Sequence, residues 1–127
     1  MAVAAGLAAA VFTAPAGSAA WCSGSVSVAK ARTSVGKVVR VKARVASAYY
    51  ARASNGSPTF IDLQFAYPDS RRLTLVIWRE NRGNFPSAPE RMFRRGTLVC
   101  VRGVVGRYGG AAQIEVSAWN APGRLIR

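Results

Sequence analysis

Positive side chains recur at every second position early in the sequence, at Arg40, Lys42 and Arg44. In an extended chain this spacing places all three on one face, opposite the apolar positions between them. A row of cations on a strand can follow the phosphates of a nucleic acid. Arg72 and Arg102 occupy the corresponding outward positions of two later apolar stretches. The competing interpretation is an ordinary strand face that only contacts solvent.

Aromatic residues accompany these cations. Tyr49 and Tyr50 follow the basic stretch directly, and Phe60 and Trp78 take outward positions on later stretches. Aromatic rings provide surfaces on which unpaired bases stack. The nine residues therefore form a candidate nucleic-acid-binding set, with single-stranded DNA or RNA as the expected partner.

The residue types that usually perform catalysis are scarce. The sequence has no histidine, and its five acidic residues are scattered. General acid–base or nucleophilic chemistry usually needs a histidine, a Cys–His pair or two neighbouring carboxylates. Two cysteines without histidine do not complete a zinc site. We expect no enzyme activity, no metal, no cofactor and no small-molecule substrate.

The first twenty residues carry no charge and are mostly Ala, Val and Gly. Small residues at Ser18 and Ala20 fit the cleavage rule for signal peptides, although the usual positive segment near Met1 is absent. A membrane anchor is the alternative, which Pro15 and the weak hydrophobicity of alanine oppose. We expect a cleaved export signal over residues 1–20, which places the protein outside the cell or in the cell envelope.

Only two cysteines, Cys22 and Cys100, follow that segment. An even number in an oxidising compartment predicts one disulfide bond. It would join the N-terminal arm, residues 21–35, to a strand near the end of the chain.

Net charge indicates an acidic partner. The chain has 18 basic and 5 acidic residues, a net charge of +13. Such an excess favours nucleic acid, anionic lipid or anionic polysaccharide. Most of the basic residues are arginines, which suits phosphate and base recognition. A GC-rich genome would give the same bias.

Hydrophobic alternation predicts five strands, near residues 36–45, 60–65, 71–80, 96–108 and 111–119. Inward positions include Val41, Leu75, Ile77, Val101 and Ile114. A helical turn is expected at residues 28–34, and another at residues 88–93. Residues 36–45 and 96–105 also align without gaps, which sets Ala43 beside Gly103. Small residues there suit a strongly coiled strand that closes a barrel.

These segments resemble a known family. The runs are G-x-x-V-x-V-x-G/A-x-V from residue 36, N-G-x-P-T-F-I-D-L from residue 55, V-I-W from residue 76, R-x-F-x-x-G from residue 91 and C-V-x-G-x-V-x-x-Y-x-G-x-x-Q-I from residue 100. Together they are similar to small bacterial OB-fold nucleic-acid-binding domains, secreted or nuclease-associated. The resemblance spans residues 36–116. It departs at Gln64 and Phe65, where the family usually has a glycine after the D/N-L pair.

The resemblance implies an all-β, five-stranded OB-fold Greek-key barrel with one short helix between strands 3 and 4, and it implies nucleic-acid binding. We expect a monomer with the barrel at residues 36–120 and a C-terminal tail at 121–127. OB barrels also bind oligosaccharides, so a cell-envelope module for a polyanion or a protein is the alternative.

Several candidate residues have a structural alternative. Trp78 could pack under the N-terminal arm, and Tyr50 could cap the barrel. Tyr108, beside the Gly109-Gly110 turn, is assigned a structural role, and Asp62 an internal ion pair.

Overall fold

The computed structural model describes residues 22–119 and 124–126, so the expected signal peptide lies outside the described residues. The strands are β1 (Val38–Tyr50), β2 (Thr59–Leu63), β3 (Leu73–Ile77), β4 (Leu98–Tyr108), β5 (Ala111–Glu115), β6 (Ala118–Trp119) and β7 (Arg124–Ile126). The helices are α2 (Val28–Arg32), the 3-10 helix η2 (Arg79–Asn84) and α3 (Pro89–Met92). The five predicted strands correspond to β1–β5.

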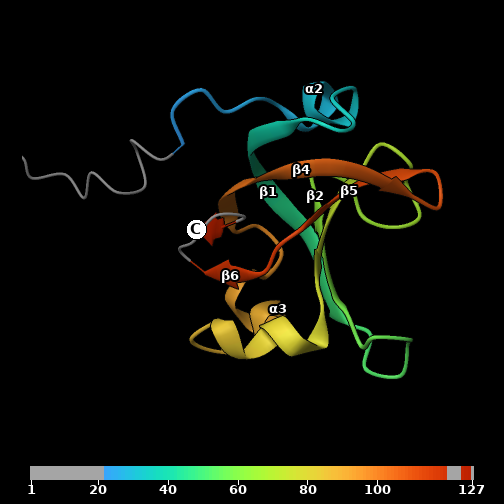
Figure 1. The fold of residues 1–127 in the computed structure, drawn as a ribbon, viewed down its shortest axis with the longest axis vertical. Helices are drawn as coiled ribbons and strands as arrows, with labels where there is room; N and C mark the ends of the chain where they lie inside the picture. The colour runs from blue at the N-terminus through green and yellow to red at the C-terminus, as the bar shows by residue number, and fades with distance from the viewer. Residues whose placement is uncertain (1–21, 120–123, 127) are drawn as a thin grey trace, which may run out of the picture.

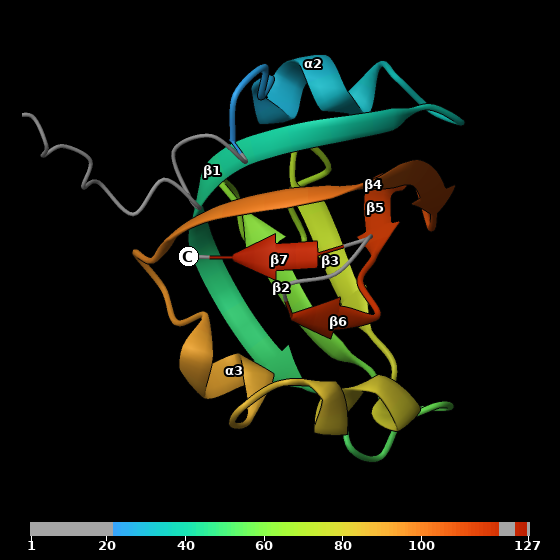
Figure 2. The same ribbon diagram turned by 60° about the vertical axis from the view of Figure 1, so that its left-hand side comes forward.

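Strand order closes the sheet into a barrel. The strands follow the order β1-β2-β3-β5-β4, and β4 pairs again with β1. All of these pairs are antiparallel except β3 with β5. β1 pairs with both neighbours because residues 38–44 pair with β4, whereas residues 45–50 pair with β2, with a bulge between Val45 and Ser47. The fold is the expected five-stranded OB barrel with a small helix, α3, between β3 and β4 (Figures 1 and 2).

The barrel interior is built by the alternating apolar positions. Val41, Leu75, Ile77, Val101 and Ile114 are all buried, as predicted. On β3, alternation also predicts outward positions for Thr74 and Val76, yet the structure buries both. β3 has a paired strand on each side, and side chains of these neighbours, such as Phe60 opposite Val76, stand beside its outer face.

β2 ends earlier than predicted. The strand stops at Leu63, and Gln64 has a φ of 69°. This left-handed conformation favours glycine, which is the residue that the resembling family usually has here. The chain therefore keeps the turn without the glycine, and Phe65 leaves the strand instead of continuing its inward face.

The small residue at Gly103 is explained by a close contact with the neighbouring strand β5. A Cβ atom at this position would lie 2.5 Å from Cγ2 of Ile114, which is too close for any side chain. β4 can therefore coil against β5 only with glycine there.

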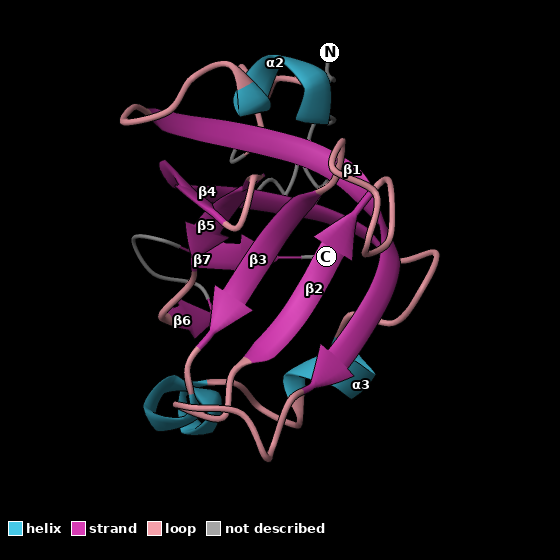
Figure 3. Ribbon diagram, turned by 90° about the vertical axis from the view of Figure 1, so that its right-hand side faces the viewer, coloured by secondary structure: helices cyan, strands magenta, loops and turns pink. Residues whose placement is uncertain are grey.

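Helices close the two ends of the barrel (Figure 3). At one end, Ser27 caps α2 by accepting a hydrogen bond from the Lys30 backbone N–H at 3.1 Å, and α2 buries Val28 and Ala31. At the other end lie η2 and α3, next to buried Phe85 and Phe93. The two predicted helical turns are confirmed, whereas η2 was not predicted.

The N-terminal arm lies outside the barrel and is attached to it at two points. A disulfide bond joins Cys22 to Cys100, as expected. The N-terminal arm also pairs with β1 at one residue, Val26. Its backbone N–H donates to the Arg40 carbonyl at 2.7 Å, and its carbonyl accepts from the Lys42 N–H at 3.4 Å. These bonds cover the edge of β1 that β4 does not use.

The C-terminal part was predicted incompletely. The expected strand at 111–119 divides into β5 and β6, and the expected tail contributes β7, which pairs with β4 and β6. Among the described residues, no helix is long and apolar enough to cross a membrane.

Candidate functional site

The outer face of the barrel carries a groove of about 440 Å³, which we call the aromatic groove. It lies over β1, β2, β3 and β5, between the β2–β3 loop and the β4–β5 hairpin. The lining residues are Ser47, Tyr49, Phe60, Asp62, Tyr67, Arg72, Thr74, Tyr108, Ala111, Ala112 and Gln113.

Three tyrosines surround this groove with exposed rings. Tyr49 extends from β1, Tyr67 from the β2–β3 loop and Tyr108 from the end of β4, with exposed fractions of 65%, 75% and 78%. Phe60, which is half-buried, lies on β2 within the groove. Aromatic rings left this accessible around one groove can stack against planar or apolar ligand groups.

The floor of the groove contains a buried carboxylate, Asp62. It accepts hydrogen bonds from the Ser47 hydroxyl at 3.1 Å, the Tyr67 backbone N–H at 2.9 Å and the Thr74 hydroxyl at 2.7 Å. A buried carboxylate is tolerated when such donors replace water. The bond to Tyr67 also anchors the loop that carries one of the three rings.

Arg72 completes this network. Its Nε donates to the Thr74 hydroxyl at 3.1 Å and lies 3.8 Å from Oδ1 of Asp62, and its Nη1 donates to the Asp69 carbonyl at 2.9 Å. The guanidinium lies 5.0 Å from the centre of the Tyr67 ring. The internal ion pair expected for Asp62 is confirmed, and the paired Arg72 guanidinium lines the groove.

Of the nine predicted binding residues, the structure brings together Tyr49, Phe60 and Arg72. Tyr50 points to the opposite side of β1, where the Arg82 guanidinium lies 3.6 Å from the centre of its ring. Arg82 also donates to Glu90 at 2.8 Å and to the Thr59 hydroxyl. Tyr50 therefore belongs to the packing at the η2 end of the barrel.

Trp78 also contacts protein. A Cβ atom on Gly56, in the β1–β2 loop, would lie 2.9 Å from Cζ3 of Trp78. The indole thus packs against that loop, not under the N-terminal arm.

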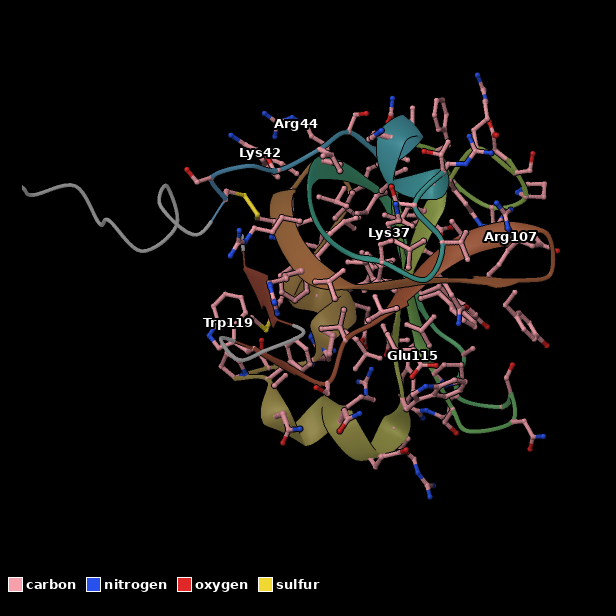
Figure 4. The ribbon with its side chains drawn as sticks, turned by 45° about the horizontal axis from the view of Figure 1, so that its top comes forward. Lys37, Lys42, Arg44, Arg107, Glu115 and Trp119 are labelled. Atoms are coloured by element: carbon pink, nitrogen blue, oxygen red, sulfur yellow. A yellow bond between two sulfur atoms is a disulfide. The ribbon has the colours of Figure 1, made fainter. Side chains whose placement is uncertain are left out.

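The remaining predicted cations lie on the outer face of β1 and β4. Arg40 and Arg102 are opposite each other in register and half-buried. Lys42 and Arg44 are exposed and project together from β1 (Figure 4). All four lie outside the aromatic groove, so the expected interleaving of cations and stacking rings on one face does not occur.

Two rings of the groove were missed from the sequence. Tyr67 was not considered, and Tyr108 was assigned a structural role although its ring is the most exposed of the three. The available signal was the position of Tyr67 in a turn after Ala66, and of Tyr108 at the last residue of a strand, next to the turn at Gly109.

Electrostatic pairing lowers the pKa of two acids. Hydrogen bonds from the Arg71 guanidinium, at 2.7 and 3.1 Å, and from its backbone N–H lower the pKa of Asp69 to about 2. Burial raises the pKa of Glu90, but the hydrogen bond from Arg82 and nearby positive charges outweigh it, so that the pKa falls below its ordinary value. Both carboxylates are charged and paired at neutral pH.

No protein-family model matches the sequence, and no curated protein matches it. Among solved structures, a protein assigned as aspartyl-tRNA synthetase from Leishmania major Friedlin is 16% identical with a TM-score of 0.47, over 73% of this chain and 19% of that one. Aspartyl-tRNA synthetase from Entamoeba histolytica is 11% identical with a TM-score of 0.49, over 74% and 20%. Asparaginyl-tRNA synthetase from Pyrococcus horikoshii is 18% identical with a TM-score of 0.41, over 66% and 19%. The chain thus spans about a fifth of the length of these structures.

Proposed function

We propose that the protein is a non-catalytic module that binds nucleic acid, with a preference for single strands, through the aromatic groove. The observation that carries this proposal is the arrangement of Tyr49, Tyr67 and Tyr108 around one groove with exposed rings. A single strand offers unpaired bases that stack on such rings, whereas a duplex keeps its bases stacked inside. Arg72, although its charge is paired with Asp62, lines the groove with a guanidinium that can donate to a phosphate.

Overall charge supports the same partner. A net charge of +13 raises the local concentration of a polyanion and speeds its encounter with the groove. The protein would act as a monomer outside the cell or in the cell envelope. Its route there rests on the uncharged sequence of residues 1–20.

The test compares the affinity of Tyr108→Ala with that of the parent for a labelled single strand, at several salt concentrations. Loss of one stacking ring is worth about 1–3 kcal/mol, or about 5- to 150-fold in affinity. The salt dependence should stay the same, because a phenol releases no counterions. Val104→Ala is the matched control, since Val104 is exposed on the same strand outside the groove.

Two results would contradict this proposal. If Tyr108→Ala bound the single strand as tightly as Val104→Ala does, stacking in the groove would be wrong. If a duplex of the same length bound as tightly as the single strand, the preference for single strands would be wrong.

A second candidate is a cell-envelope module that binds an anionic polysaccharide. Its support is the position of Lys42 and Arg44, which lie apart from the exposed tyrosines. Competition between heparin and the labelled single strand separates the two. Equal affinity for both polymers, together with an unaffected Tyr108→Ala variant, would favour the polysaccharide.

A further inference from the structure

A second groove, which we call the cationic groove, lies between the start of α2, the middle of β1 and the β2–β3 loop. Its volume is about 760 Å³. Lys42, Arg44 and Arg95 are its exposed cations. It shares no lining residue with the aromatic groove.

The groove exists because β1 changes partners at this point. The β1–β4 pairing ends at Arg44, and the β1–β2 pairing begins at Val45 and continues past the bulge at residue 46. The residues that line the groove where β1 changes partner strands include three small ones, Ala43, Ala46 and Gly96. Two backbone bonds hold it in shape, because Gln64 N–H donates to the Arg44 carbonyl at 2.8 Å and Gly96 N–H donates to the Val45 carbonyl at 2.8 Å.

Among the residues that the structure describes, no carboxylate forms an ion pair with the three cations of this groove. Nη1 of Arg44 donates to the Gly96 carbonyl at 2.9 Å, which positions the guanidinium without neutralising it. The one carboxylate in the lining, Asp69, is paired with Arg71 at 2.7 Å. Arg71 in turn lies 4.1 Å from the centre of the Phe65 ring, so the Asp69–Arg71 pair is held against the same loop.

The two grooves lie on opposite sides of one loop. In the β2–β3 loop, Tyr67 and Arg72 line the aromatic groove, whereas Phe65 and Asp69 line the cationic groove. On β1, Ala46 and Ser47 are consecutive and line one groove each. A chain that leaves the aromatic groove across this loop therefore arrives among Lys42, Arg44 and Arg95.

We propose that the cationic groove holds the sugar-phosphate backbone of the same single strand whose bases stack in the aromatic groove, and that it does so without reading bases. This inference rests on the proposed function. Guanidinium and ammonium groups bind phosphate and release its counterions, which gives affinity without sequence preference. A strand that is too short to cross the loop occupies the aromatic groove alone.

The experiment measures affinity and salt dependence with oligothymidines of about 4 and about 16 nucleotides, the range that single OB folds cover. The test variant carries Lys42→Gln, Arg44→Gln and Arg95→Gln. The control variant carries Arg52→Gln, Arg79→Gln and Arg91→Gln, which removes the same charge from exposed positions outside both grooves. All six side chains are exposed, and thermal unfolding verifies that both variants remain folded.

With the parent protein, the long strand should show the steeper salt dependence. In the test variant its slope in log affinity against log salt should fall by about 2, at about 0.7 for each of three cations. For the short strand, the slope of log affinity against log salt should be the same in both variants as in the parent protein. In the control variant, the long strand should still have a steeper slope than the short strand.

Each further outcome has a separate meaning. Equal slopes for the two lengths in the parent protein, or an equal loss in both variants, would overturn the cationic groove as a backbone site while leaving the aromatic groove intact. No binding of either length would overturn the proposed function itself. Heparin that binds in the presence of saturating long oligothymidine, and is lost in the test variant, would assign the groove to a polysaccharide and overturn the inference.

Discussion

At the scale of single residues, Asp69 shows how one neighbour sets the charge of a loop. Its pKa is about 2 because Arg71 donates to both of its carboxylate oxygens. We expect Arg71→Gln to raise this pKa toward the ordinary value of 3.8. A pH titration of the Asp69 carboxyl by NMR measures the change.

The sign of the effect on stability follows from that lowered pKa. The pairing stabilises the folded state fully above the unfolded-state pKa, and this contribution is lost as the pH falls toward 2. The difference in stability between the parent and Arg71→Gln should therefore shrink over this acidic range. An unchanged Asp69 titration in Arg71→Gln would show that the pairing does not exist in solution.

Residues on strands were easier to predict than residues in turns. Phe60 was found from alternation along a strand, and Tyr49 lies in a strand that continues further than expected. Alternation says nothing about the turn that holds Tyr67, and it does not show that Tyr108, the last residue of β4, leaves its ring exposed beside the hairpin turn. Both were therefore missed as groove residues. Trp78 was expected on the outer face of a strand, whereas β3 ends at Ile77 and the indole packs on Gly56. Tyr50 is the last residue of β1 and is held by Arg82, and alternation connects neither ring to its partner.

At the scale of elements, the register of β4 gives a direct test. Val101 is fully buried and Val104 is 55% exposed on the same strand. We expect Val101→Ala to lower the free energy of unfolding by about 1–3 kcal/mol through lost burial and a cavity, whereas Val104→Ala should be nearly neutral. Urea unfolding measures both. A larger effect at Val104 would mean that the register is shifted by one residue.

The strands that could be predicted are those with a regular hydrophobic period. β1 to β5 met this condition, whereas the two helical turns, of five and four residues, are too short to show a period. The helix η2 buries none of its residues, so it leaves no apolar pattern in the sequence. β6 and β7 are very short and pair with each other in parallel, far from any hairpin signal. Their pairing depends on the position of β4, which only the closed barrel defines.

At the scale of the whole molecule, the disulfide bond ties the N-terminal arm to the barrel. Cys22 and Cys100 are 78 residues apart, and closing a loop of that size restricts the unfolded chain by about 4 kcal/mol. We expect Cys22→Ser to lower the free energy of unfolding by up to that amount. This variant leaves Cys100 as a buried thiol, which packs as a small apolar group.

Urea unfolding of Cys22→Ser, with Ser23→Ala as the control, measures the contribution of the bond. The parent protein under reducing conditions should match Cys22→Ser. Equal midpoints for all samples would show that the bond does not contribute to stability.

The pairing of β1 with both β2 and β4 has a consequence for how the chain folds. β2 follows β1 closely in sequence, so these two strands can pair early. Residues 38–44 of β1 pair only with residues 98–104, which come much later in the chain. Contacts between such distant segments slow folding, because the loop between them must close before its contacts form. Until β4 arrives, the first half of β1 presents an unpaired edge with an apolar face, the kind of edge on which separate chains pair with one another. Three cations on its other face make neighbouring copies repel, so the basic row can protect the unfinished barrel from aggregation before the protein meets any ligand.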